Sequence, residues 1–296
     1  MSGTPRLVLR GRELRPAPER PLIMGIVNAS PESFSDGPLV GGVAEQLDRA
    51  LRLVDDGADL IDVGGESGVT DRPAVSAAEE AERVVPLVER LAAEGAVVSV
   101  DTWMAAVARA ALAAGAALVN DVSGLRDPGV AEACAEAGAG LIVTHTRAEP
   151  KHKAFPHYDD VVGDVVGLLR ERMAEARARG VGEEQLVVDP GPDLAKLPAD
   201  TVAVLRALPE VARLGRPVLL ALSRKDFVGA LTGRPPRERL AGTLAAIGAG
   251  LDAGGSIVRV HDVAAVADFL AVRAALRGER EVPPDLRLDP GLRRAV

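Results

Sequence analysis

Eight apolar runs of strand length, separated by segments with helical periodicity, constrain the fold of this chain more than any other feature. The runs are Leu22–Val27, Leu60–Val63, Val97–Val100, Ala117–Val119, Leu141–Val143, Leu186–Val188, Val218–Leu222 and Ile257–Val260. Short apolar runs bounded by polar or turn residues are typical of buried parallel strands. Eight strand–helix alternations without a long polar linker predict an α/β fold, a (β/α)8 TIM barrel, with a doubly wound sheet as the main alternative.

The length of 296 residues suits one barrel, which needs about 250 residues, so no second domain is required. We expect a short cap or hairpin over residues 1–20, the barrel over residues 21–277, and a tail outside the core over residues 278–296.

The composition argues against several kinds of partner. Aromatic residues make up only 2% of the chain, the net charge is -8 and the isoelectric point is near 5.2, so we expect no nucleic-acid and no membrane partner. The single cysteine, Cys134, rules out an intrachain disulfide and fits a reducing compartment. The first twenty residues lack the apolar core of a signal peptide, and the longest apolar run, Leu240–Leu251, is too short to span a bilayer. A cytoplasmic location is therefore expected.

Polar residues lie at or near the end of nearly every predicted strand. They are Asn28, Asp62, Glu66, Asp101, Asn120, Asp121, His145, Asp189, Ser223, Arg224, Lys225, Arg259, His261 and Asp262. In a barrel these ends converge on one mouth, so residues far apart in sequence become neighbours. A single Asp, Asn or Ser after a strand is more often a helix cap than a ligand. Asp121, Ser223 and Asp262 are therefore also candidates for helix caps. Glu66 is a candidate for a structural anchor in the barrel interior.

The polar residues at the strand ends divide by charge into two sets. Carboxylate and amide oxygens suit a planar ligand rich in N–H groups, and this set is Asp101, Asn120 and Asp189. Cationic side chains suit phosphate or pyrophosphate oxygens, and this set is Arg224, Lys225, Arg259 and His261. Asn28 could help to place a Mg2+ ion that bridges those oxygens. The pattern predicts group transfer with pyrophosphate as the leaving group.

The motifs at these strand ends resemble those of the dihydropteroate synthase family, in the same order, from about residue 21 to residue 277. They are Asn28–Gly37, Asp62–Ser67, Val100–Thr102, Val119–Gly124, Pro156–Val162, Asp189–Gly191, Leu222–Lys225 and Arg259–Asp262. The resemblance implies condensation of 6-hydroxymethyl-7,8-dihydropterin pyrophosphate with p-aminobenzoate, which gives dihydropteroate and pyrophosphate. It also implies a homodimer formed through barrel helices.

The resemblance implies a role for each matching residue. Asp101, Asn120 and Asp189 would bind the pterin ring, with Lys225 close to it, and Arg259, His261 and Asn28 would hold pyrophosphate and Mg2+. Two further residues of the substrate site would be Ser223 and Arg72. The residues assigned to catalysis are Lys225, Arg259, His261, Phe34 and Asp36.

The chain departs from the family pattern mainly on the acceptor side. Gly68–Pro73 replaces Thr-Arg-Pro-Gly, Thr144–Thr146 replaces Met-His-Met, and Pro192–Leu197 replaces Ile-Gly-Phe-Gly-Lys-Thr, so that Leu194 takes the place of an aromatic residue. Glu32 stands for an aspartate in the first loop. Two alternatives follow: a pterin-binding paralogue without efficient synthase activity, and a methyltransferase that moves a methyl group from a methyl-folate to a corrinoid.

Overall fold

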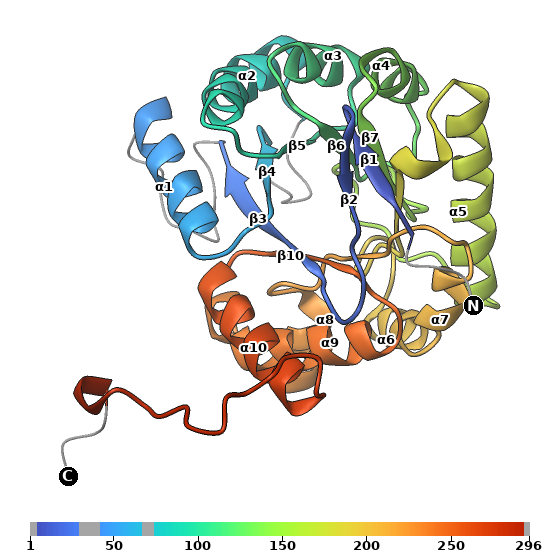
Figure 1. The fold of residues 1–296 in the computed structure, drawn as a ribbon. Helices are drawn as coiled ribbons and strands as arrows, with labels where there is room; N and C mark the ends of the chain where they lie inside the picture. Colours follow the sequence, from blue (N-terminus) through green and yellow to red (C-terminus); the bar gives the residue numbers. More distant parts are fainter. Residues whose placement is uncertain (1–4, 30–41, 67–73, 293–296) are drawn as a thin grey trace.

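Eight parallel strands form the sheet at the centre of the computed structural model, which describes residues 5–29, 42–66 and 74–292 (Figure 1). The strands are β3 (Leu22–Asn28), β4 (Leu60–Gly64), β5 (Val98–Asp101), β6 (Leu118–Asp121), β7 (Gly140–Thr144), β8 (Leu186–Asp189), β9 (Leu219–Leu220) and β10 (Ile257–Val260). They lie in the order β8-β7-β6-β5-β4-β3-β10-β9. A parallel bridge between Val188 and Val218 joins the two ends, so the sheet curls into a barrel, as predicted.

Helices surround this sheet (Figure 1). In chain order they are α1 (Val43–Asp55), α2 (Ala77–Ala93), α3 (Ala105–Ala113), α4 (Gly129–Ala137), α5 (Val161–Ala178), α6 (Pro198–Arg206), α7 (Leu208–Ala212), α8 (Asp226–Thr232), α9 (Leu240–Asp252) and α10 (Val263–Leu276), with short 3-10 turns at Glu183–Gln185, Pro236–Glu238 and Pro290–Leu292. Ser76 begins α2 as the sequence suggests, because its hydroxyl accepts the Glu79 N–H at 3.2 Å.

An N-terminal hairpin closes the bottom of the barrel. Its strands β1 (Leu7–Leu9) and β2 (Arg12–Leu14) are antiparallel, and Leu7 and Leu9 are buried in one apolar cluster with the inward-facing residues at the start of the barrel strands. Beyond α10, the last described residues run away from the barrel (Figure 1).

The alternation of side chains along each strand decides which residues enter the barrel. In β4, Leu60 belongs to the inner apolar cluster, whereas Ile61 and Val63 pack outward in the cluster beneath the helices. Asp62 therefore points inward, one layer above Leu60. The interior thus has an apolar floor and a polar upper layer, which positions the candidate site.

The helices of the described part of the chain are not long and apolar enough to cross a membrane.

Candidate active site

Strand register brings three of the predicted site residues to one level of the mouth. Asn28 pairs with Gly64, Gly64 with Asp101, and Asp101 with Asn120 along four neighbouring strands. Gly64 leaves space between its neighbours, since a Cβ there would lie 3.7 Å from both the Asn28 Oδ1 and the Asp101 Cβ. The register explains why polar residues at the ends of separate apolar runs become neighbours.

Arg259 crosses the mouth from β10 and binds two carboxylates. Its Nε donates to Asp62 Oδ2 at 2.6 Å and its Nη2 donates to Asp101 Oδ2 at 2.7 Å. The Asn120 amide also donates to Asp62 Oδ2, at 3.1 Å. Asp62, the most deeply buried member, thus ties together one residue predicted for pyrophosphate and one predicted for the pterin ring.

The electrostatics of this cluster follow from its burial. Burial raises the pKa of Asp101 to about 7, and Arg259 opposes that rise while the nearby Asp62 and Asp121 add to it. Burial alone would lower the pKa of Arg259, but Asp62 and Asp101 outweigh it and raise that pKa. The guanidinium therefore stays charged inside the barrel and compensates the carboxylates.

Asp189 lies on the other side of the mouth at the end of β8. It is almost completely buried, and its Oδ1 accepts the Gly191 N–H at 2.7 Å. Burial raises the pKa of Asp189, while that hydrogen bond and the charges of Lys225, Lys196 and Arg259 oppose the rise. Three cations, from the loop after β8, the start of α8 and strand β10, thus act on one carboxylate that is predicted to bind the pterin.

Lys225 occupies the N-cap position of α8, and its charge affects the pKa values of both Asp101 and Asp189. It therefore lies near two of the residues predicted for the ring. The guanidinium of Arg239 donates to the Lys225 carbonyl at 3.1 Å and fixes the turn that carries the lysine.

Ser223 and His261 contact each other at the ends of neighbouring strands. The Ser223 hydroxyl and His261 Nδ1 are 2.9 Å apart, and the His261 N–H donates to the same hydroxyl. Arg224 does not join this pair, because its guanidinium forms a two-point ion pair with Asp262 at 2.7 and 3.1 Å. Asp262 occupies the N-cap position of α10, as expected, but its carboxylate binds Arg224 and forms no side-chain cap.

Two other strand-end carboxylates anchor loops. Asp121 faces away from Asn120 and accepts the Ser123 N–H at 2.6 Å in the loop after β6. The expectation of a helix cap at Asp121 is wrong, because α4 begins after Pro128. Glu66 forms a buried ion pair with Lys151 at 3.1 Å and so connects the end of β4 with the loop after β7. Three predicted residues, Phe34, Asp36 and Arg72, lie outside the described residues.

The altered loop after β8 keeps an unusual backbone. Asp193 and Ala195, which stand where the family pattern has glycine, both have positive φ, at 62° and 54°. The Asp193 carboxylate compensates by accepting the Phe227 N–H and the Thr201 hydroxyl, each at 3.2 Å. Because Phe227 lies in α8, this contact connects the Asp189 loop with the turn that carries Lys225.

Sequence reasoning missed a buried lysine in the same loop. Lys196 is 1% exposed, and its Nζ lies 2.7 Å from the Nδ1 of His145. The other ring nitrogen of His145 lies 2.7 Å from Asp164 on α5. A sequence signal was present, because Lys196 is the one residue of Pro192–Leu197 that matches the family pattern Ile-Gly-Phe-Gly-Lys-Thr.

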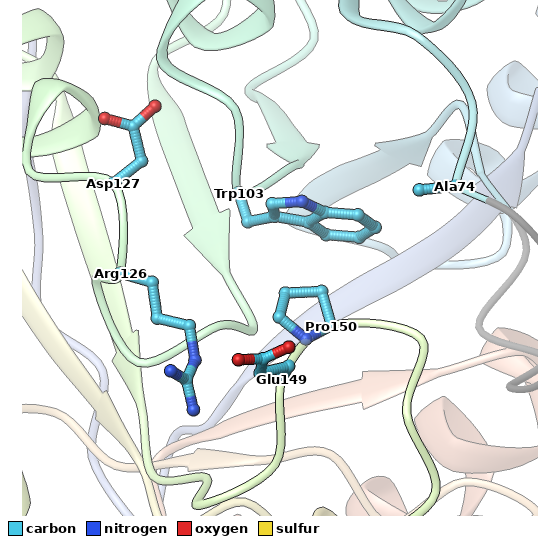
Figure 2. Close-up of a pocket in the computed structure, with 6 residues that line it drawn as sticks. All are labelled: Ala74, Trp103, Arg126, Asp127, Glu149 and Pro150. Atoms are coloured by element: carbon cyan, nitrogen blue, oxygen red, sulfur yellow. The ribbon is translucent and has the colours of Figure 1, made fainter.

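A hollow of about 360 Å³ lies among the segments that follow β4, β5, β6 and β7 (Figure 2). Its lining residues are Ala74, Trp103, Arg126, Asp127, Glu149 and Pro150. Asp127 accepts the N–H groups of Ala105 and Gly129, and Arg126 donates to the Ala148 carbonyl at 3.1 Å. These polar groups hold loops in place, so the hollow is distinct from the cluster inside the barrel.

Among the described residues, His, Cys, Asp and Glu form no group of three that could hold a metal ion. A cation at this mouth would need oxygen atoms from a ligand or from water in addition to the amide of Asn28, which suits Mg2+.

Comparisons with known proteins agree on one family. Residues 24–261 match the family described as pterin binding enzyme. The chain is 41% identical over 260 residues to the dihydropteroate synthase of Bacillus subtilis, covering 87% of this chain and 89% of that protein. It is also 42% identical over 277 residues to a Mycobacterium tuberculosis protein named inactive dihydropteroate synthase 2, and the match covers 90% of this chain and 86% of that protein.

A solved structure of Xanthomonas albilineans dihydropteroate synthase with 4-aminobenzoic acid superposes on this fold with a TM-score of 0.85. The two chains are 44% identical, and the match covers 93% of this chain and 98% of that chain.

Proposed function

This chain belongs to the pterin binding enzyme family, and we infer that it carries out the dihydropteroate synthase reaction. The reaction condenses 6-hydroxymethyl-7,8-dihydropterin pyrophosphate with p-aminobenzoate and releases pyrophosphate. The protein is accordingly a transferase of folate biosynthesis with small-molecule substrates.

The arrangement of Arg259 between Asp62 and Asp101 is the observation that carries the assignment of residues. A pterin edge presents several N–H groups, and carboxylate and amide oxygens at Asp101, Asn120 and Asp189 can accept them. The cations of Arg259 and Lys225 stand beside these acceptors. The site therefore combines an N–H-binding wall with positive charge for a phosphorylated substrate.

The chemistry assigned to these residues is mainly electrostatic. As the bond between the exocyclic methylene and the pyrophosphate breaks, negative charge develops on the leaving oxygen, and Arg259 and His261 stabilise it. The electron-rich pterin delocalises the positive charge that remains on the methylene. The amine of p-aminobenzoate then forms the new C–N bond and loses a proton, so a protein nucleophile is unnecessary.

We also propose that Mg2+ assists through Asn28, whose amide oxygen lies at the end of β3. The ion would neutralise charge on the pyrophosphate group. Asn28→Ala is expected to weaken binding of the pterin pyrophosphate in the presence of Mg2+ more than in its absence, as measured by calorimetry.

The decisive experiment measures pyrophosphate release from the pterin pyrophosphate with and without p-aminobenzoate. Release that depends on p-aminobenzoate, together with formation of dihydropteroate, is the expected result. A rate of pyrophosphate release that is the same with and without p-aminobenzoate would reject the synthase activity. The absence of saturable binding of the pterin pyrophosphate would reject the site itself.

A second candidate, a pterin-binding protein with little synthase activity, is favoured by two observations. The relative from Mycobacterium tuberculosis that bears the name inactive is 42% identical to this chain. Leu194, Thr144 and Thr146 also replace residues of the family pattern. Complementation of a strain that lacks dihydropteroate synthase distinguishes the two candidates. The methyltransferase alternative is set aside, because the curated relatives described above are synthases or their paralogue.

Two further proposals concern assembly and location. We propose a homodimer formed through barrel helices, which light scattering would test, and a cytoplasmic location, which the single buried Cys134 supports. A monomer in solution at micromolar concentration would reject the first.

A further inference from the structure

Lys196 is a fully buried lysine whose ammonium group lies among hydrogen-bond acceptors. Its Nζ is 2.7 Å from His145 Nδ1, 2.9 Å from the Gly191 carbonyl and 3.2 Å from the Leu194 carbonyl. The His145 carbonyl lies somewhat farther away, at 3.4 Å. A buried lysine is tolerated only when its charge and its donors are satisfied, and here three close acceptors match three N–H groups.

The contact with Lys196 fixes the state of His145. Burial lowers the pKa of Lys196 to about 7, and the charges of Asp189 and Asp164 oppose that change. As an ammonium the lysine can only donate, so His145 Nδ1 accepts from it. At the other ring nitrogen the Asp164 carboxylate accepts, so in either state of the lysine the ring proton lies on Nε2. From Nε2 it is donated to Asp164 across 2.7 Å. Burial and the neighbouring Lys196 charge lower the pKa of His145 to about 4, which agrees with a neutral ring.

Asp164 ends this chain of contacts at the surface of the barrel. Its carboxylate also accepts the Arg147 Nε–H at 3.0 Å. Burial raises the pKa of Asp164, but the hydrogen bonds from Arg147 and His145 outweigh burial and lower it. The imidazole is thus held between a fixed carboxylate and the buried lysine, so its own position is well determined.

The loop that surrounds the ammonium carries residues of the candidate site. The Gly191 peptide is held from both sides, because its N–H binds the Asp189 carboxylate and its carbonyl binds Lys196. Gly191 has a φ of 65°, and a Cβ there would lie 2.0 Å from the His145 carbonyl, so the loop is tightly packed against β7. A shift of this peptide would turn the Asp189 carboxylate away from the mouth.

Leu194 is held by the same group. Its carbonyl is the third acceptor of Lys196, and its side chain stands where the family pattern has an aromatic residue on the acceptor side. One buried ammonium therefore connects the residue predicted to bind the pterin with the residue predicted to contact the second substrate.

We propose that Lys196, oriented by the neutral ring of His145, is a positioning residue that sets the Asp189 carboxylate and the Leu194 backbone for substrate binding. Its effect on substrates rests on the proposed function, whereas its effect on the loop does not. Lys196 acts on the substrates through the Gly191 and Leu194 peptides and touches neither substrate itself.

Two substitutions of His145 separate this role from general packing. His145→Asn places an amide oxygen near the position of Nδ1 and keeps an acceptor for Lys196, whereas His145→Gln places an amide N–H near Nε2 and keeps only the donor for Asp164. We expect His145→Gln and Lys196→Met to raise the Kd for the pterin pyrophosphate by about tenfold or more, and His145→Asn to change it by about threefold or less. Lys153→Met, at an exposed lysine, is the matched control.

Two measurements without substrate test the loop directly. Hydrogen exchange of the peptide covering residues 190–196 should accelerate in Lys196→Met and His145→Gln but remain slow in His145→Asn and Lys153→Met. In the wild-type protein, the nitrogen shifts of the His145 ring, one of four histidines, should show a proton on Nε2 from pH 5 to pH 8.

Equal exchange in Lys196→Met and the wild type, or equal damage from the two His145 substitutions, would overturn the proposal. A proton on Nδ1 would do the same. A wild-type protein that binds no pterin pyrophosphate rejects the proposed function instead, and the exchange and ring-nitrogen measurements still decide the role of Lys196.

Discussion

Arg259 donates a hydrogen bond to Asp101 at 2.7 Å, although their strands, β10 and β5, are separated in the sheet by β3 and β4. The residue predicted to hold pyrophosphate and a residue predicted to bind the pterin are therefore one ion pair. Loss of the arginine would leave Asp62 and Asp101 buried without their cation, a situation that costs more than the loss of one contact. The predicted binding sites for the two halves of the substrate are thus coupled through this ion pair.

Arg259→Gln is therefore expected to weaken two ligands to different degrees. The pterin pyrophosphate should lose affinity by about 100-fold, because both its phosphate contact and the support of Asp101 are lost. A pterin without phosphate should lose about tenfold, from the second effect alone. Calorimetry with both ligands measures the ratio. An unchanged affinity for the bare pterin would show that the ion pair does not support ring binding.

Asp189→Asn tests the opposite wall of the mouth. The substitution replaces a carboxylate that accepts two N–H groups with an amide that accepts on one side only. We expect the affinity for a pterin to fall by about tenfold or more, and Lys225 and Lys196 to lose their common counterion. Equilibrium binding measures the change, with a thermal melt as the control for folding. Wild-type affinity in a folded variant would remove Asp189 from the ring site.

The sequence alone predicted the barrel and most of the strand-end residues because both depend on local patterns. Asp62 and Arg259 lie within short apolar runs and Asp101 follows one, and the strand period of two turns each of them inward. Their mutual contacts were not predictable, because they depend on which strands close the barrel. Arg224 shows the limit of this reasoning: it lies in the loop after β9, next to Ser223, yet its backbone has a positive φ of 59° and its side chain binds Asp262.

The Lys196 cluster was missed for a related reason. Its members come from the ends of three elements, and His145 and Lys196 are 51 residues apart. A lysine in a loop is ordinarily solvated, so local sequence gives little sign that this one is buried. The departures from the family pattern in this loop pointed to a changed site, but the structure shows that Asp193 and Ala195 retain backbone conformations typical of glycine.

Ala195→Gly and Asp193→Gly form a matched pair with opposite expected effects. Both residues have positive φ, which costs the folded state about 1–2 kcal/mol for a residue with a Cβ, and glycine removes that cost. Glycine also gives the unfolded chain more conformational freedom, which lowers the free energy of unfolding by about 0.4–1 kcal/mol. Ala195→Gly should raise the free energy of unfolding by about 0.5–1 kcal/mol. Asp193→Gly should lower it, because the bonds to Phe227 and Thr201 are lost. Urea denaturation measures both, and a destabilised Ala195→Gly would contradict the strain.

Glu80 on α2 lies behind the mouth and is completely buried. A Cβ at Gly65 would lie 2.8 Å from the Glu80 Cγ, so the side chain packs directly against the loop that follows β4. Burial raises the pKa of Glu80 from 4.5 to about 7; Asp101 and Glu66 add to the rise, and Thr102 and Arg83 oppose it. The carboxyl is therefore protonated in the folded state over a range where it is ionised in the unfolded chain.

Glu80→Gln should consequently change how stability depends on pH. Because the folded pKa is raised, the favourable contribution of Glu80 is complete below about pH 4.5 and is lost as the pH rises through 7. Glutamine keeps the shape and cannot ionise, so the variant should gain about 1–3 kcal/mol over the wild type at pH 8 and little at pH 5. Urea denaturation at the two pH values measures the difference, with Glu82→Gln on the exposed side of α2 as the control. A gain that is the same at both pH values would mean that the effect comes from packing and not from the buried charge.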